Sequence, residues 1–439
     1  MEAYFAALAD VVQQSLRGTE RFTATFDAEE TDFVRMNRGK VRQPGTVAQR
    51  YFSIRLIAGT RHAEHMLSLA GDLGVDSAAV REAVAGLRAA LPDLADDPLL
   101  LLPTVVHSSR SVREGSLPPS AAVVGEILAA ANGLDLVGIY AAGPIWRGFA
   151  NSEGQRNWHE TTAFNLQWSL YHRTDKAVKS GFAGFTWDGA AFAHKMQEAR
   201  ERLALIGMPS RALAPGKYRA YLSPSAMEEI AATLCWGGFS GRALKTRQSA
   251  LSRMEDGEML APGVTLVEDT AGGVAPAFQA EGFARPPRVP LIEGGRLVGS
   301  LVSPRTAREF GMAENGANGS EMPESLAMAG GSLPTADALA ALDTGIAVGN
   351  LHYLNYSDRP AGRMTGMTRF ATFWVEKGKV VAPIDVLRFD DTVYRLLGAN
   401  LEALTQETEF ILDAGTYQSR QLASLRVPGA LVSEMAFTL

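Results

Sequence analysis

Residues 151–170, NSEGQRNWHETTAFNLQWSL, change from a polar, glycine-containing start to strict alternation. The apolar residues of the second half are Phe164, Leu166, Trp168 and Leu170, and the polar residues between them are Asn165, Gln167 and Ser169. A period of two indicates a β-strand, in which neighbouring side chains point to opposite faces. This stretch therefore predicts a strand, preceded by a turn at 151–154.

The pair His159-Glu160 inside this stretch is similar to the start of a helical zinc motif. Such a motif needs two histidines on one helix face, with the glutamate between them as general base. Positions 163 and 164, where the second histidine would stand, are alanine and phenylalanine. Because a strand turns neighbouring side chains apart, we interpret His159 and Glu160 as polar residues at a strand entrance rather than metal ligands.

The other candidate ligands and nucleophiles are similarly weak. His62 and His65 enclose Glu64 in a segment that also looks extended, so the two rings would face opposite ways. The remaining histidines stand alone, and Cys235 lies in an apolar helical context that is typical of a buried, inert thiol. No nucleophile elbow, Walker A loop or dinucleotide-binding glycine motif occurs in a strand-to-helix context.

Composition narrows the class of protein. The chain has 439 residues, of which 46% are hydrophobic and 21% charged, and its formal charge is −6. A net negative charge argues against direct binding to nucleic acid, because such binding normally needs a basic patch. The lone cysteine and the absence of a signal-peptide pattern or a long apolar run predict a cytoplasmic protein without a membrane span.

The first part of the chain mixes helices and strands. Apolar spacing predicts helices over 2–17, from a cap at Asp76-Ser77 to Leu91, over 119–131 and over 190–206. Residues 32–70 read as paired strands, and 135–154 as two short strands and a turn. This half should therefore be an α+β domain.

The Pro-Gly break at 215–216 suggests a boundary, which we place so that residues 1–212 and 213–439 form two domains. Glycine turns between β-rich arms predict hairpins at 290–303 and 370–386. Residues 311–333 have little periodicity and predict a loop. The expected fold is α+β, with an N-terminal helix-and-sheet domain followed by a β-rich C-terminal domain.

Several segments, taken in order, resemble the TldD/PmbA family, whose members are often described as modulators of DNA gyrase. They are FVRMNRGKVRQ (33–43), NSEG (151–154), LSPSAMEEIAATL (222–234), LIEGGRLVGSLVSPRTAREFG (291–311), RMTGMTRF (363–370) and VEKGKVVAPI (375–384). The resemblance implies a heterodimer that cleaves unfolded or small peptides. In it, a TldD-like subunit carries an HExxxH zinc motif, and the TldE-like (PmbA) subunit lacks that motif.

The zinc helix of the family corresponds here to residues 224–236. Its frame is kept, because Ser223 can cap the helix, Pro224 suits the first turn and Gly237 can end it. The resemblance puts Ala232, Thr233 and Gly237 where the first histidine, the glutamate and the second histidine would stand. We therefore expect neither a metal nor any other cofactor, and no catalytic residue.

The leading hypothesis is a TldE/PmbA-like, non-catalytic subunit that acts with a TldD-like zinc protease subunit, or with a second copy of itself, on a peptide substrate. Asn151, Ser152 and Gly154 are the candidate substrate contacts, because a small polar turn exposes main-chain groups to an extended peptide. An ordinary turn between strands is the alternative reading of these three residues.

Two other functions remain open from the sequence. One is a self-sufficient peptidase with an unfamiliar site that draws on His159, Glu160, His172 or His352. The other is a modulator that binds gyrase or another protein without enzymatic activity. Bound metal in the purified protein would favour the peptidase.

Overall fold

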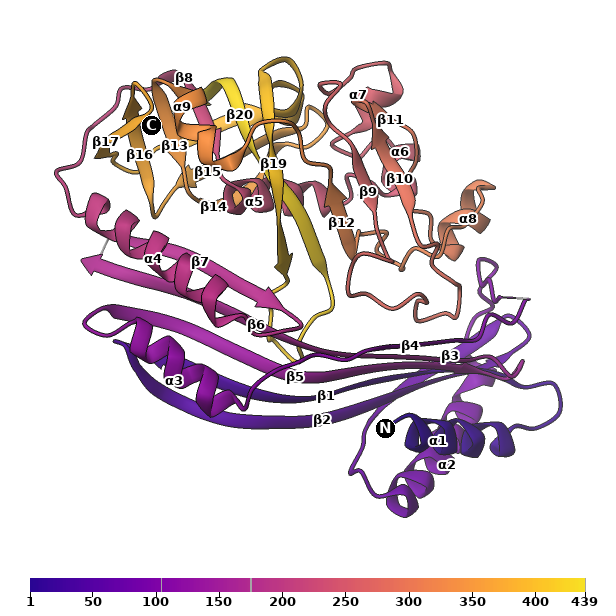
Figure 1. The fold of residues 1–439 in the computed structure, drawn as a ribbon. Helices are drawn as coiled ribbons and strands as arrows, with labels where there is room; N and C mark the ends of the chain where they lie inside the picture. The colour runs from indigo at the N-terminus through magenta and orange to yellow at the C-terminus, as the bar shows by residue number, and fades with distance from the viewer. Residues whose placement is uncertain (104, 174–175, 439) are drawn as a thin grey trace.

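The computed structural model describes residues 1–103, 105–173 and 176–438. Its first half is built on one long, bent sheet (Figure 1). Within the described residues the strand order is β3-β2-β1-β5-β6-β4, and β7 also pairs with β6. The strands are β1 (Arg21–Asn37), β2 (Lys40–Ala58), β3 (Arg61–Ser68), β4 (Ser109–Arg113), β5 (Asp135–Asn151), β6 (Arg156–Arg173) and β7 (Lys176–Gly184).

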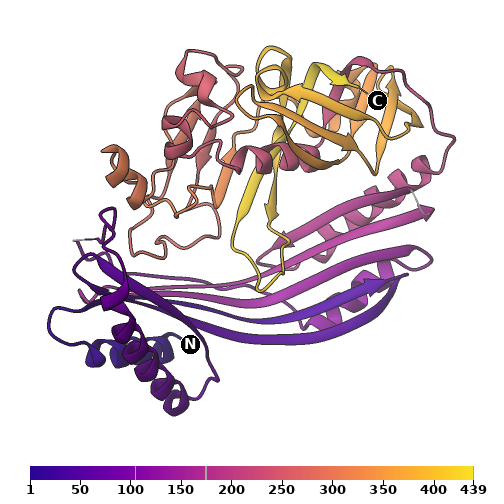
Figure 2. The same cartoon turned by 180° about the vertical axis from the view of Figure 1, so that it is seen from behind.

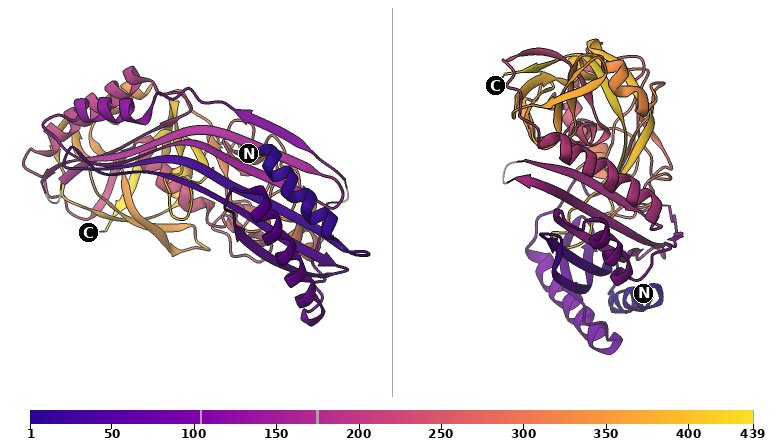
Figure 3. Two further views of the ribbon diagram at one scale, coloured as in Figure 1. Left: turned by 90° about the horizontal axis from the view of Figure 1, so that it is seen from below. Right: turned by 60° about the vertical axis from the view of Figure 1, so that its left-hand side comes forward.

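Helices pack on this sheet near both of its ends (Figure 3), and α4 also contacts the second half of the chain. At one end, Phe5 of α1 packs against Phe26 and Trp158. At the other end, Phe192 of α4 packs against Trp168 of β6. These helices are α1 (Glu2–Ser15), α2 (Leu73–Ala90), α3 (Ser120–Ala130) and α4 (Gly189–Ile206).

Two predictions for this half were wrong. Helix α2 begins at Leu73, where Asp72 accepts a hydrogen bond from the Val75 amide, and the carboxylate of the predicted cap Asp76 instead accepts from the amides of Ala70 and Gly71. Residues 135–151 form one strand, not two. Gly143 has φ +142°, and this backbone conformation lets β5 bend and continue through Pro144 while it stays paired with β6.

The second half is a larger mixed sheet. Its central order within the described residues is β11-β10-β9-β12-β20-β8-β13-β16-β17, with β14, β15, β18 and β19 attached to it. The strands are β8 (Gly216–Leu222), β9 (Leu266–Glu268), β10 (Val289–Glu293), β11 (Arg296–Leu297), β12 (Ser325–Met328), β13 (Gly345–Val348), β14 (Leu351–Asp358), β15 (Arg363–Thr368), β16 (Thr372–Glu376), β17 (Lys379–Pro383), β18 (Arg388–Thr392), β19 (Leu401–Leu412) and β20 (Ser424–Phe437).

The hairpins predicted at 290–303 and 370–386 are confirmed as β10–β11 and β16–β17. The prediction of a loop over 311–333 was wrong in part, because β12 lies inside it and pairs with both β9 and β20. The helices of this half are α5 (Pro224–Cys235), α6 (Gly241–Lys245), α7 (Ser252–Glu255), α8 (Pro304–Phe310) and α9 (Ala338–Leu342). Single helical turns lie at Thr335–Asp337 and Arg395–Ala399 in this half and at Leu91–Asp93 in the first half.

The α+β fold class is confirmed, and the two sheets come from separate parts of the chain. The segment 207–215 joins α4 to β8, and the predicted boundary after residue 212 falls inside it. The β19–β20 hairpin extends from the second half down to the first sheet, as both Figure 1 and Figure 2 show. Among the described residues, no helix is long and apolar enough to cross a membrane.

Candidate functional site

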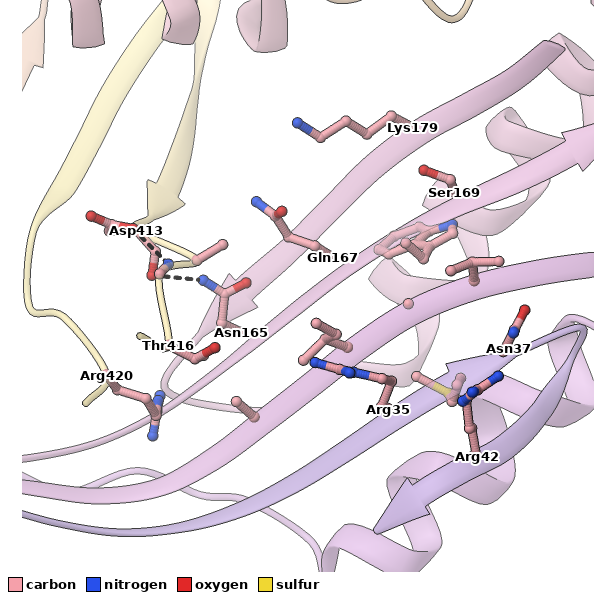
Figure 4. Close-up of a pocket in the computed structure, with 18 residues that line it drawn as sticks. Arg35, Asn37, Arg42, Asn165, Gln167, Ser169, Lys179, Asp413, Thr416 and Arg420 are labelled. Atoms are coloured by element: carbon pink, nitrogen blue, oxygen red, sulfur yellow. Dashed lines mark hydrogen bonds between the residues drawn. The ribbon is translucent and has the colours of Figure 1, made fainter. Parts of the chain in front are cut away.

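A cavity of about 500 Å³ lies where the tip of the β19–β20 hairpin meets the long N-terminal sheet (Figure 4). Its floor is formed by side chains from β1, β2, β5, β6 and β7, and one wall is formed by residues 413–416. The strand register explains the floor. Arg35 of β1 lies opposite Ile139 of β5, which lies opposite Gln167 of β6. Side chains opposite one another in a sheet share a face, so these three point into the same space.

The predicted alternation of β6 accounts for three of its four residues in the cavity lining, and Trp168, from the other face, is the fourth. Asn165, Gln167 and Ser169 border the cavity, while Phe164 and Leu166, on the other face, are buried in the core. The strand prediction is thus confirmed. The Asn165 amide nitrogen also donates hydrogen bonds to the carbonyls of Leu412 (3.0 Å) and Asp413 (3.2 Å), so the floor and the wall are joined directly.

Arg420 holds the hairpin tip against the sheet. Its guanidinium is buried, and it donates hydrogen bonds to the carbonyl oxygens of Gly143 (3.1 Å) and Ala163 (2.9 Å). Burial lowers the pKa of Arg420 to about 10, which leaves the side chain charged at neutral pH. The Glu29 carboxylate accepts a hydrogen bond from the Arg420 amide at 3.3 Å. These contacts fix the wall of the cavity.

A second, smaller cavity continues the first toward α5. It has a volume of about 30 Å³ and shares Asn165, Gln167 and Lys179 with the larger cavity. Ser225 and Glu228 of α5 also line it. The two cavities therefore form one surface that runs from the β1–β2 end of the sheet to the start of α5.

Helix α5 forms where the sequence predicts it. The Ser223 hydroxyl accepts a hydrogen bond from the Ala226 amide, Pro224 occupies the first turn, and Gly237 beyond the helix end has φ +80°. The residues of α5 that are not fully buried, here called the α5 stripe, are Pro224, Ser225, Glu228, Glu229 and Ala232, and the exposed Trp236 follows the helix end.

The carboxylates of this stripe lie beside a cation. Glu229 Oε1 is 4.0 Å from Nζ of Lys179 on β7. Burial raises the pKa of Glu228 to about 7 and also raises the pKa of Glu229, and the Lys179 charge opposes both shifts. Glu228 therefore changes its charge near neutral pH.

The three positions that the resemblance matches to the zinc motif do not fit a metal ion. Ala232 has no ligand atom, and the buried Thr233 hydroxyl donates a hydrogen bond to the Glu229 carbonyl at 2.8 Å. Gly237 has left the helix. Nearby Cys235 is buried in the core cluster, and burial raises the pKa of its thiol, as expected for an inert residue. Among the described residues, no group of three or more His, Cys, Asp or Glu side chains could hold a metal.

The histidines considered from the sequence are dispersed. His159 and Glu160 follow one another in β6 and so face opposite sides of the sheet. His159 is buried, and this burial, with the charges of Arg147 and Arg113, lowers its pKa to about 4. His62 lies 3.3 Å from an Asp97 carboxylate oxygen, and His65 points to the other face of β3.

His352 and His172 lie apart from that pair. Nε2 of His352 is 3.1 Å from an Arg369 guanidinium nitrogen. His172 stands near the end of β6, where its ring borders Gly207. None of these histidines lines the two cavities.

Asn151, Ser152 and Gly154 form the turn between β5 and β6. The Asn151 side-chain oxygen accepts hydrogen bonds from the amides of Glu153 and Gln155, both at 3.0 Å, and Gly154 has φ +85°. The Ser152 amide donates to the Phe22 carbonyl. These three residues do not line the large cavity, and their role as substrate contacts stays a prediction.

Sequence reasoning missed the cations of the cavity, which are Arg35, Arg42, Lys179 and Arg420. A signal for two of them was present in FVRMNRGKVRQ, which places four basic residues within eight positions and contains no acid. Lys179 and Arg420 gave no comparable signal, because only the docking of the hairpin and β7 brings them to this space.

The second half of the chain matches the profile of a known protein family. The profile of the PmbA/TldA metallopeptidase C-terminal domain matches residues 215–439. The crystal structure of TldE from Thermococcus kodakarensis has the same fold, with a TM-score of 0.79 and 15% identity over 99% of this chain and 100% of that chain. A search of curated proteins found no match.

Two more solved structures share the fold. A protein described as a candidate modulator of DNA gyrase from Thermotoga maritima MSB8 matches with a TM-score of 0.76 and 13% identity, over 100% of both chains. Another with the same description, from Bacteroides thetaiotaomicron VPI-5482, has a TM-score of 0.77 and 15% identity, over 99% of this chain and 98% of that chain. At such low identities the likeness concerns the fold alone.

Proposed function

This chain belongs to the TldD/PmbA family, and from that premise we propose that it is a metal-free subunit that binds peptide beside a zinc-bearing relative. The observation that carries the proposal is the α5 stripe next to the cavity. It presents Ala232 where the family motif would present a histidine, while the surrounding helix keeps its cap, its proline and its glycine end. The frame of a zinc helix without ligands suits a subunit whose chemistry is supplied by a partner.

The cavity supports the peptide-binding half of the proposal. Asn165, Gln167 and Ser169 repeat every second residue along β6, so they are spaced about 7 Å apart. An extended peptide repeats its backbone donors and acceptors at the same interval. A strand-like peptide that lies along β6 would therefore meet a side-chain amide or hydroxyl at each repeat, between apolar Val137 and Ile139 of the floor.

The turn at 151–154 is a further proposed contact for the same peptide. Ten residues of β5 separate Ala141, at the cavity, from Asn151, and this corresponds to about 33 Å along the strand. A peptide of about ten extended residues would span that distance. Long, unfolded substrates would then reach both places, whereas short ones would occupy the cavity alone.

The proposed partner is a TldD-like zinc protease subunit, with a second copy of this chain as the other option. The location that we propose is the cytoplasm, because a single cysteine suits a reducing compartment. Direct binding to nucleic acid is not part of the proposal, since the charge of the whole chain is −6.

The test is reconstitution with an HExxxH-bearing relative from the same organism. We expect the two chains to elute together from a sizing column and the mixture to cleave an unfolded protein such as reduced casein. Neither this chain alone nor a mixture that contains a partner with its motif glutamate changed to glutamine should cleave it. Matched controls are the Arg81→Gln variant of this chain, whose side chain is exposed on α2, and the zinc content of each preparation.

Two results would contradict the proposal. Stoichiometric zinc together with cleavage by this chain alone would make it a self-sufficient peptidase. Failure to associate with the partner, together with co-purification and altered supercoiling activity of gyrase, would favour the modulator function.

A further inference from the structure

We propose that the large cavity selects peptides through a carboxylate, which is held by Arg35 and Arg42 at the β1–β2 end of its floor. The inference rests on the proposed function and adds to it the chemical class of the substrate. The observation behind it is the net charge of the side chains that line the cavity, which is positive, whereas the net charge of the whole chain is negative.

The side chains that line the cavity include four cations and one carboxylate, so the lining carries three net positive charges, while the chain carries −6. Two of the cations already have partners. Arg420 donates to the carbonyls of Gly143 and Ala163, and Lys179 faces Glu229. The carboxylate, Asp413, accepts a hydrogen bond from the Gly415 amide at 2.7 Å.

Arg35 and Arg42 have no such partners. Both are exposed, and within the part of the chain that the structure describes neither guanidinium forms a hydrogen bond or an ion pair. The register shift between Arg35 and Met36 leaves Arg42 as the extra residue of β2, and this bulge brings both arginines to the rim of one cavity. Arg35 extends toward the middle of the cavity, and Arg42 lies beside Asn37 at its end (Figure 4).

The neighbours of Arg35 across the sheet are neutral. Ile139 lies opposite it on β5, and Gln167 and Gly181 continue the row on β6 and β7. The acidic groups of the adjoining small cavity, Glu228 and Glu409, lie at the other end, where Lys179 and Lys195 balance them. The arginine end is therefore the part of the surface that favours an anion.

Guanidinium groups bind carboxylates through paired, charge-assisted hydrogen bonds, which are stronger and more directional than neutral ones. Guanidiniums at one end of a row of side-chain amides suit a peptide that brings its carboxylate to Arg35 and Arg42 and lays its backbone along β6. The carboxylate has two sources in a peptide, an acidic side chain or the free C-terminus, and the experiment below separates them.

The test measures binding of four fluorescent peptides of one sequence to the full chain, by anisotropy at low and moderate salt. The peptides combine acidic side chains or their amide counterparts with a free or an amidated C-terminus. We expect the neutral, amidated peptide to bind weakest, and the Arg35→Gln/Arg42→Gln double variant to lose about tenfold in affinity for carboxylate peptides only. Added salt should weaken binding of the same peptides.

Arg81→Gln is the control, since it removes an exposed arginine far from the cavity and should bind like wild type. If only the acidic side chains raise the affinity, or only the free C-terminus does, that result identifies the source of the carboxylate. Equal binding of all four peptides, or undiminished binding by the double variant, overturns the inference but leaves the peptide-binding subunit intact. Absence of binding to any peptide overturns it as well, whereas the proposed function is judged separately by complex formation and cleavage with the zinc-bearing partner.

Discussion

The Arg420 guanidinium donates a hydrogen bond of 2.9 Å to the carbonyl oxygen of Ala163, and these residues are 257 positions apart in the chain. The contact joins the tip of the β19–β20 hairpin to the middle of β6. Since the same hairpin forms a wall of the cavity, the shape of the cavity depends on this buried side chain.

Replacing Arg420 with Ala should destabilise the protein and loosen the hairpin tip. The change leaves the carbonyls of Gly143 and Ala163 without their donor, and each unsatisfied buried group costs about 1–3 kcal/mol. We expect the free energy of unfolding in urea to fall by roughly 2–5 kcal/mol. Arg81→Ala should change it by less than about 0.5 kcal/mol, as is usual for surface sites. An equal loss in both variants would show that the Arg420 contacts are not formed in solution.

His159 should make stability depend on pH below neutrality. Its pKa is lowered to about 4 in the folded chain by burial and by Arg147 and Arg113, while an unfolded histidine titrates near 6.5. Because the pKa of His159 is lower in the folded chain than in the unfolded chain, the unfolded chain takes up the proton at a higher pH. The contribution of neutral His159 is therefore complete above about pH 6.5 and is lost as pH falls toward 4.

The measurement is the free energy of unfolding of wild type and His159→Gln between pH 7 and pH 4. We expect the curve of the variant to be flatter, by up to about 1.4 kcal/mol per pH unit, which is the limit for one proton. The difference between the two proteins removes the contributions of other groups. Parallel curves would mean that His159 is protonated or exposed in the folded chain.

The sequence predicted secondary structure correctly where neighbouring residues alone determine it. The alternation at 164–170 predicted β6 and put Asn165, Gln167 and Ser169 on one face of it, although nothing in the sequence indicated a cavity there, and the Ser-Pro start with the Gly end predicted α5. The start of α2 was misplaced because Asp72 and Asp76 are both plausible caps, and tertiary contacts of Asp76 with the amides of Ala70 and Gly71 decide between them.

The site depended on contacts between distant segments, which local patterns do not encode. The two short strands expected within 135–154 are one strand, because pairing with β6 keeps β5 continuous through Gly143 and Pro144, two residues that disfavour a strand interior. The docking of Arg420 onto Ala163 follows from how two sheets meet, so no window of the sequence could indicate it.

Two variants of the turn at 151–154 separate its proposed contact with substrate from its contribution to stability. Asn151→Ala should lower the free energy of unfolding by about 1–3 kcal/mol, because its side-chain oxygen accepts from the amides of Glu153 and Gln155. Ser152→Ala removes only the hydroxyl of a half-buried side chain and should leave the free energy of unfolding within about 0.5 kcal/mol of wild type. Weaker binding of a long peptide to Ser152→Ala, with unchanged binding of a short one, would support substrate contact. Unchanged binding of both would make the stretch an ordinary turn.

Restoring the zinc motif should fail for a reason that the structure makes specific. Ala232→His places an imidazole on the half-buried stripe of α5 and should fold like wild type. Thr233→Glu puts a carboxylate into a buried position, which costs at least about 1–3 kcal/mol, and Gly237→His is strained at φ +80°. We expect the triple variant to be clearly less stable and to bind zinc weakly, as calorimetry would show. Tight binding with normal stability would mean that the three positions converge after all.

Peptide binding should weaken as pH rises through neutrality. Burial raises the pKa of Glu228 to about 7, so this side chain is neutral below that pH and becomes an anion above it. It lines the small cavity together with Lys179, and the new negative charge opposes a carboxylate peptide. Interactions between partly exposed charges are worth about 0.2–1 kcal/mol at close range, and Glu228 lies at the other end of the surface from Arg35 and Arg42, so affinity should fall by about twofold or less between pH 6 and pH 8. The Glu228→Gln variant should bind equally well at both pH values, and the neutral, amidated peptide should show no such change with wild type. An affinity that rises with pH, or a dependence that persists in Glu228→Gln, would assign the titrating group elsewhere.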